Sequence, residues 1–381
     1  MVIVGGGVMG TAIAHGLACR GVGDVLLLER AAIASGPTGG STAILRQHYS
    51  QALLVRMATL GLSTYRAFGE AVGGSCGFTR TGLLVAVEAD DRASLEHNVA
   101  LGQAEGVRTE MVSPTEVAEL DPRFALDDLA LCWEPEAACC DPYLAAAGFA
   151  AAARNAGARV EEGVRVDTVS PEGVETSAGA VAAGATVVAA GPWSGGLVEP
   201  LGYELPLRAA RAEVGRFRLP DGFGPAPPSL ADFSALRFYC KPGEDGFLEV
   251  GSLDPRHTEH PVDPDGCPAG AERETLAGFA AALRRRLPGS ARGHWRGSWS
   301  AVYDVTPDWY PAIGFVPGSE SVVVAAGFSG HGFKLAPAVA VAVTELILDR
   351  RSTTFDLDLL APERFARNEL VDSVYGYSVL G

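Results

Sequence analysis

Three glycines near the start of the chain constrain its fold more than any other feature. Gly5, Gly7 and Gly10 directly follow the apolar segment 1–4, and a helical pattern of apolar residues follows them over 11–20. In this spacing the first glycine permits a tight turn, the second lets a pyrophosphate approach the backbone, and the third lets helix and strand pack closely. Free N–H groups at the helix N-terminus then bind the phosphates. The pattern predicts a dinucleotide site.

An acidic residue stands where such a site requires one. Segment 25–28 predicts a second buried strand, and Glu29 ends it, at the distance from the glycines where a carboxylate accepts hydrogen bonds from the adenosine ribose. A carboxylate there also repels a 2′-phosphate, so NADP is disfavoured. We expect Val8, Met9 and Arg30 to line the same site. The motif alone leaves FAD and NAD open.

Charge and cysteine content exclude several classes of partner. The chain has 381 residues and a formal net charge of −16. Nucleic acid and anionic lipid both require clustered lysine and arginine, so neither is an expected partner. The seven cysteines are irregularly spaced and form no C-x-x-C, which argues against a disulfide framework or a zinc site. No apolar run reaches the roughly 20 residues that span a bilayer. We expect a cytoplasmic protein with reduced thiols and no bound metal.

Two patterns of secondary structure alternate along the chain. Buried strands with helices recur in three separated stretches, whereas 206–299 contains strands divided by proline, glycine and aspartate, which is typical of an antiparallel sheet. The expected fold class is α/β plus α+β, with a discontinuous Rossmann-type cofactor-binding domain and an antiparallel-sheet substrate domain. The expected bounds are 1–78, 138–205 and 298–360 for the cofactor-binding domain, 79–137 and 206–297 for the substrate-binding domain, and 361–381 for a C-terminal tail.

Four segments resemble one known family. The loop 39–49, GGSTAILRQHY, is similar to the flavin-contacting loop of the D-amino-acid oxidase-like FAD-dependent oxidoreductases. Segments 189–194 (AAGPWS), 303–308 (YDVTPD) and 327–337 (GFSGHGFKLAP) resemble other signatures of that family, above all of its sarcosine oxidase branch and of the β subunit of multi-subunit sarcosine oxidase. The resemblance covers nearly the whole chain. It implies a Rossmann-type FAD-binding domain and oxidation of a carbon–nitrogen bond.

The resemblance also implies which residues contact the flavin. A helix that starts near Gly332 would present its N–H groups to the negative charge of the reduced flavin around N1 and O2. The alternative is that Gly330 to Gly332 only form a tight entry to that helix. The implied flavin-binding residues are Gly40, Ser41, Thr42, Val166, Ala190, Gly191, Trp193, Gly330, Gly332, Phe333 and Lys334.

Five side chains are candidates for the substrate site. Arg46 matches the arginine that binds the substrate carboxylate in the family, with Lys334 as its partner; the alternative is an ion pair between Arg46 and a protein carboxylate. Tyr303 matches an aromatic residue of that site. Tyr239, like Tyr49, is a weaker candidate, because a tyrosine in a strand often only packs. His331 belongs to the family signature, but it could serve only to brace its loop.

Departures from the family matter as much as matches. Ala301 and Ile44 stand where related enzymes carry a cysteine or a histidine that binds flavin covalently, so the resemblance implies non-covalent FAD. Glu249 stands near the position of a lysine that activates oxygen, which puts fast oxidase activity in doubt. Ala43 replaces an arginine near the flavin.

The sequence supports one leading function and leaves alternatives open. The leading reading is oxidation of a small amine or amino acid by hydride transfer to flavin N5, giving an imine, with a secondary, N-methyl or cyclic amino acid favoured. A primary amino acid of the glycine type, an NAD-linked dehydrogenase and a non-catalytic flavin subunit of a larger complex are the alternatives. The electron acceptor is oxygen or another compound, and the protein is a monomer or a subunit of an oligomer.

Overall fold

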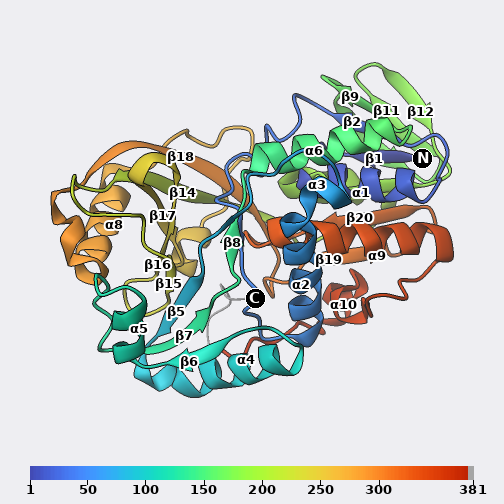
Figure 1. Cartoon of the computed structure of the whole chain (residues 1–381). Coiled ribbons are helices and arrows are strands. Elements are labelled where there is room, and N and C mark those ends of the chain that lie inside the picture. Colours follow the sequence, from blue (N-terminus) through green and yellow to red (C-terminus); the bar gives the residue numbers. More distant parts are fainter. Residues whose placement is uncertain (376–381) are drawn as a thin grey trace.

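A largely parallel sheet forms one half of the molecule. The computed structural model describes residues 1–375, and Figure 1 shows this sheet beside a second, larger one. Five strands run parallel, and β19 at the edge runs antiparallel to its neighbour. The strand order is β19-β20-β13-β1-β2-β9. The bounds are Val2–Val4 (β1), Leu26–Glu29 (β2), Arg159–Glu162 (β9), Thr186–Val188 (β13), Ala312–Phe315 (β19) and Val322–Ala326 (β20).

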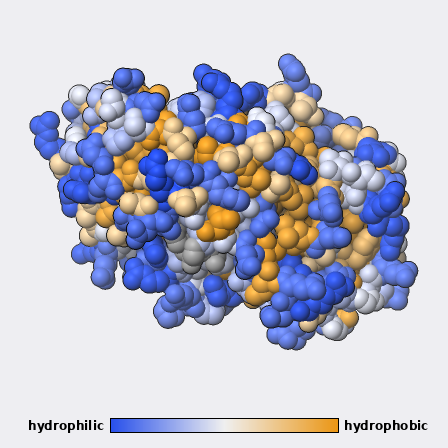
Figure 2. All heavy atoms as spheres, turned by 90° about the horizontal axis from the view of Figure 1, so that it is seen from below, coloured by the Kyte–Doolittle hydropathy of each residue, from blue (hydrophilic) through white to orange (hydrophobic). Residues whose placement is uncertain are grey.

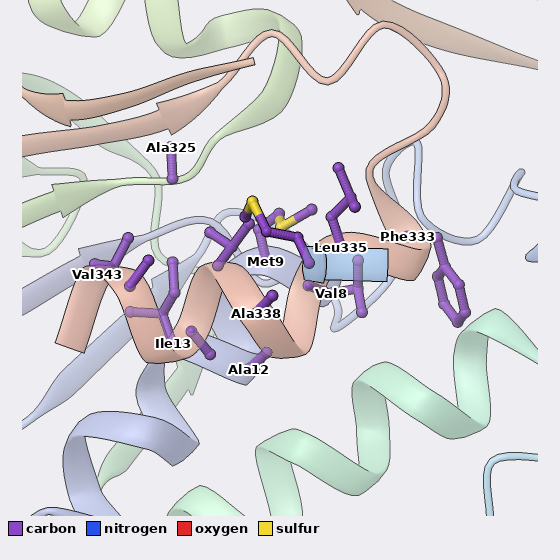
Figure 3. Close-up of a cluster of buried hydrophobic side chains, with 14 of the residues drawn as sticks. Val8, Met9, Ala12, Ile13, Ala325, Phe333, Leu335, Ala338 and Val343 are labelled. Carbon is purple, nitrogen blue, oxygen red and sulfur yellow. The ribbon is translucent and has the colours of Figure 1, made fainter. Parts of the chain in front are cut away.

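Helices cover one face of this sheet. They are α1 (Val8–Cys19), α6 (Pro142–Asn155) and α9 (Ala336–Asp349), and their apolar side chains form one buried cluster with every second residue of the strands. Figure 3 shows the crossing of α1 and α9, where Val8, Met9, Ala12 and Ile13 lie among Leu335, Ala338 and Val343. The crossing fixes the entry to α9 beside the first turn of α1.

The other face packs against a small antiparallel meander. The meander consists of β10 (Val166–Ser170), β11 (Gly173–Thr176) and β12 (Gly179–Ala182). We expected one strand over 160–169, but the structure has β9 and β10 in different sheets. Gly163 between them has φ +78°, a conformation that breaks an extended strand and suits glycine.

A mixed sheet of eight strands forms the other half. Its order is β18-β14-β17-β16-β15-β5-β7-β6, and only β5 and β15 pair in parallel. The fold class expected from the sequence is therefore confirmed. The bounds are Leu83–Val87 (β5), Glu110–Val112 (β6), Ala130–Glu134 (β7), Arg208–Arg218 (β14), Ser229–Asp232 (β15), Phe238–Pro242 (β16), Phe247–Ser252 (β17) and His294–Val305 (β18). Strand β18 runs through 297/298, so the expected bounds of the two domains stay a prediction.

Two helices pack on opposite faces of the large sheet. Helix α8 (Arg273–Arg286) buries Phe279 and Leu283 against one face, and α4 (Arg92–Ala104) buries Leu95 and Val99 against the other. The shorter helices are α3 (Phe68–Ala71), α5 (Pro114–Leu120), α7 (Ser194–Val198) and α10 (Glu363–Arg367).

One more helix and a small sheet connect the two halves. Helix α2 (Ala52–Arg66) packs on α9, and the small sheet joins β3 (Ile44–Leu45), β8 (Ala138–Cys139) and β4 (Thr79–Arg80). The helix expected over 51–71 is interrupted at Ala67, which separates α2 from α3.

The surface is mostly polar. Figure 2 shows hydrophilic side chains over much of one face, with apolar areas between them. Within residues 1–375, no helix is long and apolar enough to cross a membrane.

Candidate active site

A cavity of about 960 Å³ lies between the two halves of the molecule. Its wall contains the glycine turn after β1, the loop 35–42, the ends of β2 and β13, and strands β14, β16 and β18. Most of the residues expected to bind cofactor or substrate lie in this wall. They are Gly5, Gly7, Val8, Met9, Glu29, Arg30, Gly40, Ser41, Thr42, Val166, Ala190, Gly191, Trp193, Tyr239, Tyr303, Gly330, Gly332 and Phe333.

The glycine turn has no room for side chains. Gly5 has φ +109°, and a Cβ there would lie 2.5 Å from the carbonyl oxygen of Ala189. Gly10 lies outside the cavity wall, but a Cβ on it would come 1.9 Å from the Gly5 carbonyl oxygen. Gly10 therefore acts through packing: it lets α1 approach the turn closely enough for its N-terminus to face the cavity.

Polar groups around the turn hold it in shape. The Glu29 carboxylate accepts the N–H groups of Gly6 at 2.7 Å and Ala31 at 2.8 Å, and the Thr38 hydroxyl accepts the N–H of Val8 at 3.0 Å. Arg30 forms an ion pair with Asp265 at 2.7 Å. Its guanidinium also lies 3.8 Å from the ring centre of Trp193. Asp265 thus ties the loop after β17 to the cofactor side of the cavity.

Two further glycines let backbone lie against side chains of β18. A Cβ on Gly40 would lie 2.5 Å from the Cβ of Ala301, and one on Gly330 would lie 2.7 Å from the ring of Tyr303. Trp299 donates its Nε1–H to the Gly40 carbonyl oxygen at 2.9 Å. The loop 40–42 and the segment 330–333 therefore both approach one strand of the large sheet closely.

Two of the expected substrate residues, Arg46 and Lys334, lie buried beside the cavity wall rather than in it. The Arg46 side chain contacts the carbonyl oxygen of His48, and its guanidinium lies 4.4 Å from the ring centre of Tyr49. Lys334 donates from Nζ to the carbonyl oxygen of His331 at 3.1 Å, and its Nζ lies 6.0 Å from the Tyr49 ring centre. The ring of Tyr49 thus lies near two buried cations.

His331 links Tyr49 to the loop before β19. Its Nε2 lies 2.8 Å from the carbonyl oxygen of Trp309, which can only accept, so Nε2 carries the hydrogen. Its Nδ1 then accepts from the Tyr49 hydroxyl at 3.2 Å. Burial lowers the pKa of His331 to about 3, helped by the charge of Lys334, so the ring is neutral. In this structure His331 braces its loop through two hydrogen bonds.

The cations perturb each other and a neighbouring acid. Burial lowers the pKa of Lys334 well below its usual value, and the charge of Arg46 lowers it further. Glu134, the last residue of β7, opposes that effect. Burial raises the pKa of Glu134 to about 7, although the N–H of Gln47 and the two cations favour its charged form. Sequence reasoning missed Glu134, because one acid at the end of an apolar strand carries no motif.

Two tyrosines face the cavity in protonated form. Burial raises the pKa of Tyr303 to about 12 and raises that of Tyr239 well above its usual value. The Tyr239 hydroxyl lies 3.4 Å from that of Thr42, which joins β16 to the loop 40–42. Both phenols are therefore hydrogen-bond donors at neutral pH rather than bases.

Glu249 has a basic partner that the sequence did not reveal. Its carboxylate lies 3.0 Å from Nζ of Lys241, which stands opposite it on β16 and is buried. Sequence spacing cannot show such a pairing, because it depends on the register of two strands. The acid expected to disfavour reaction with oxygen is therefore neutralised locally by a lysine.

A second acid in the cavity wall, Asp304, fixes the segment before α9. Its carboxylate accepts the N–H of Gly327 at 2.7 Å, and its carbonyl oxygen accepts the N–H of Ser329 at 3.1 Å. Burial raises the pKa of Asp304 to about 6. No group of three or more potential ligands in the described part of the chain could hold a metal ion.

A family model decides the class of the protein. The model described as DAO, FAD dependent oxidoreductase, matches residues 1–346. The chain belongs to this family. The expected resemblance, the FAD cofactor and the oxidoreductase class are thereby confirmed, and the NAD-linked alternative is excluded.

Curated relatives of this FAD-dependent oxidoreductase share about a quarter of its sequence. The 4-methylaminobutanoate oxidase (formaldehyde-forming) of Paenarthrobacter nicotinovorans is 27% identical over 97% of this chain, which spans 46% of that oxidase. The glycine oxidase of Geobacillus kaustophilus is 27% identical over 93% of this chain and 94% of its own length. The monomeric sarcosine oxidase of Bacillus sp. (strain B-0618) is 26% identical over 97% of both.

A solved structure agrees with the fold. The L-proline dehydrogenase from P. horikoshii superposes with a TM-score of 0.87 and 27% identity, over 97% of this chain and 98% of that one.

The residues present fit FAD. The glycine turn leaves open a surface that a Cβ at Gly5 or Gly10 would fill, and Glu29 stands at the end of β2 beside it. The cavity continues from this turn to Tyr303 and the segment 330–333, where the three-ring part of the cofactor would lie.

Proposed function

We propose that this oxidoreductase oxidises the carbon–nitrogen bond of a small amine that carries a carboxylate. The observation that carries the proposal is the pair of buried cations, Arg46 and Lys334, beside the segment 330–333. Two cations inside an acidic protein are costly to bury, and an anionic ligand offsets that cost. A guanidinium matches the planar geometry of a carboxylate, and the lysine adds a second donor.

The chain's own residues supply binding, orientation and electrostatics. Gly5, Gly7, Gly10 and the N-terminus of α1 would hold the pyrophosphate of FAD, and Glu29 the ribose. The flavin, when bound, supplies the acceptor of the hydride equivalent. The N–H groups of segment 332–335 would stabilise the negative charge that this transfer creates. Ala301 offers no nucleophile, so we propose non-covalent binding.

Tyr303 and Tyr239 would fix the position of the substrate. As protonated phenols they can donate hydrogen bonds but cannot accept a proton from the amine. The substrate amine must then bind neutral or lose its proton to water or to another group. The reaction releases an imine, which water hydrolyses.

The relatives support secondary amines as the substrate class. One relative is named for 4-methylaminobutanoate, another for sarcosine, and a structural neighbour for L-proline, all of which carry a secondary amine and a carboxylate. A primary amino acid is the alternative, supported by the glycine oxidase. The electron acceptor is oxygen or another compound. The buried Lys241 beside Glu249 supports oxygen more than Glu249 alone would.

Kinetics of Arg46→Ala test the proposal. We expect KM for a carboxylate substrate to rise by roughly 2–5 kcal/mol in binding free energy, because a desolvated charge pair is lost, while FAD stays bound. Arg56→Ala is the matched control, since Arg56 lies on the surface of α2 and pairs with Glu105. An Arg46→Ala variant with unchanged KM would reject Arg46 as the anchor of the carboxylate.

A further inference from the structure

Glu134 is a buried acid that the proposed reaction does not use. Only 2% of its surface is exposed. Its Oε2 accepts the N–H of Gln47 at 3.0 Å, whereas Oε1 is buried without a hydrogen-bond partner. A buried carboxylate oxygen that makes no hydrogen bond is costly. Glu134 therefore occupies a place where its charge or its proton has a purpose beyond holding the strand.

Charged and titratable groups face Glu134 from three parts of the chain. Arg46 and Tyr49 come from the segment after β3, Lys334 from the turn before α9, and Cys132 from β7 itself. The two cations attract the Glu134 carboxylate. The carboxylate in turn raises the pKa of Tyr49 and of Cys132. Glu134 is thus the acid that shares a buried space with both cations of the proposed carboxylate site.

A substrate carboxylate changes the charge balance of this space. Before it binds, two basic side chains face one acid. Its arrival brings a second carboxylate to the same cations. Two carboxylates that share a buried site raise each other's pKa, because both cannot remain ionised cheaply. Uptake of one proton relieves the repulsion.

We propose that Glu134 is the counter-ion of Arg46 and Lys334 in the free enzyme, and that it takes up one proton from solvent when a substrate carboxylate binds. The inference rests on the proposed function and adds a proton to its binding step. The proton goes to Oε1, the oxygen without a partner, and no bond of the substrate changes. Glu134 is a positioning residue, since it acts through the two cations.

The proposal predicts a pH dependence of carboxylate binding. Burial places the pKa of Glu134 at about 7 in the free protein, and a bound carboxylate would raise it. Well below pH 7 the acid is already protonated, so binding takes up no proton from it. Above pH 7 each bound carboxylate must bring a proton, so Kd should rise about tenfold per pH unit.

Calorimetry of the FAD-loaded enzyme with propionate tests this. Propionate has a carboxylate and no amine, so its own protonation does not interfere. Titration at pH 8 in two buffers of different ionisation enthalpy gives the number of protons taken up. We expect about one proton for the wild type and close to none for Glu134→Gln, whose amide oxygen can still accept the N–H of Gln47. Glu134→Asp should retain proton uptake. Glu119→Gln, on the exposed side of α5, should match the wild type.

The other outcomes are informative in different ways. Equal proton uptake by wild type and Glu134→Gln would assign the proton to another group, such as Lys334, and would overturn the inference. A Kd for the wild type that does not change between pH 7 and pH 9 would do the same. Absence of propionate binding at every pH, with FAD retained, would instead contradict the proposed carboxylate site and the inference with it. If Glu134→Gln does not fold, the wild-type pH series and Glu134→Asp still decide.

Discussion

Asp308 and Arg364 form a buried bidentate ion pair, with Nε 2.8 Å from Oδ2 and Nη2 3.1 Å from Oδ1. Arg364 also donates to the carbonyl oxygen of Tyr310 at 2.7 Å. The pair fixes the loop that ends β18, and the carbonyl oxygen of Trp309 in that loop orients His331. A residue of α10 thus supports the wall of the active site from behind.

We expect Arg364→Met to be strongly destabilising. It would leave the Asp308 carboxylate buried without its cation, which costs roughly 3–5 kcal/mol. Urea unfolding measures the loss. Arg367→Met is the control, because Arg367 faces solvent and its ion pair with Glu369 is 3.8 Å long. Equal stability of the two variants would show that the buried pair does not hold the loop.

Gly10→Ala should abolish FAD binding while the protein remains folded. The added methyl group would meet the Gly5 carbonyl oxygen at 1.9 Å and force α1 away from the turn. The ratio of flavin to protein absorbance after purification measures retention. Gly23→Ala is the matched control, since a Cβ there meets nothing within 4 Å. Normal flavin content in Gly10→Ala would contradict the assigned phosphate site.

Gly330→Ala should slow flavin reduction more than it lowers stability. Its Cβ would lie 2.7 Å from the Tyr303 ring and displace that ring from the cavity wall. We expect a loss of about tenfold or more in the reduction rate, corresponding to at least ~1.4 kcal/mol. Gly318→Ala controls for backbone strain, because Gly318 has a similar φ of +84° but open space around it. Equal rates in both variants would remove Tyr303 from the site.

Asp304 should make stability fall as pH rises. Its pKa is raised to about 6 in the folded protein, against 3.8 for an ordinary aspartate. Between these values the native state binds more protons than the unfolded state, so the free energy of unfolding decreases with pH, by roughly 3 kcal/mol in total. Asp304→Asn should lack this part of the decrease between pH 4 and pH 6.5 in urea unfolding. Parallel pH curves for the variant and the wild type would contradict the burial of this charge.

The sequence predicted the parts of the molecule that are local. The glycine turn, Glu29 and the start of the C-terminal helical segment all depend on residues close together in the chain, and they appear in the structure within a few residues of their expected bounds. The strand expected over 160–169 was wrong because a left-handed glycine divides it.

Long-range pairings were beyond the sequence. Lys241 meets Glu249 only through strand register, and Glu134 meets Arg46 and Lys334 only because β7 ends beside two other segments. The resemblance to a known family supplied Arg46 and Lys334 as candidates, but it gave no sign of the acid between them. Such a residue becomes visible only when burial and charge are considered together in the folded protein.

The most direct test is an anaerobic absorbance spectrum of the purified protein mixed in turn with sarcosine, L-proline, glycine and an amine that lacks a carboxylate. The account predicts that the flavin band bleaches with a compound that carries both a secondary amine and a carboxylate, and that the amine without a carboxylate leaves it unchanged. Readmitted air then reports the acceptor, since rapid return of the band indicates oxygen. Bleaching by the amine alone, or by none of the four compounds, would contradict the account.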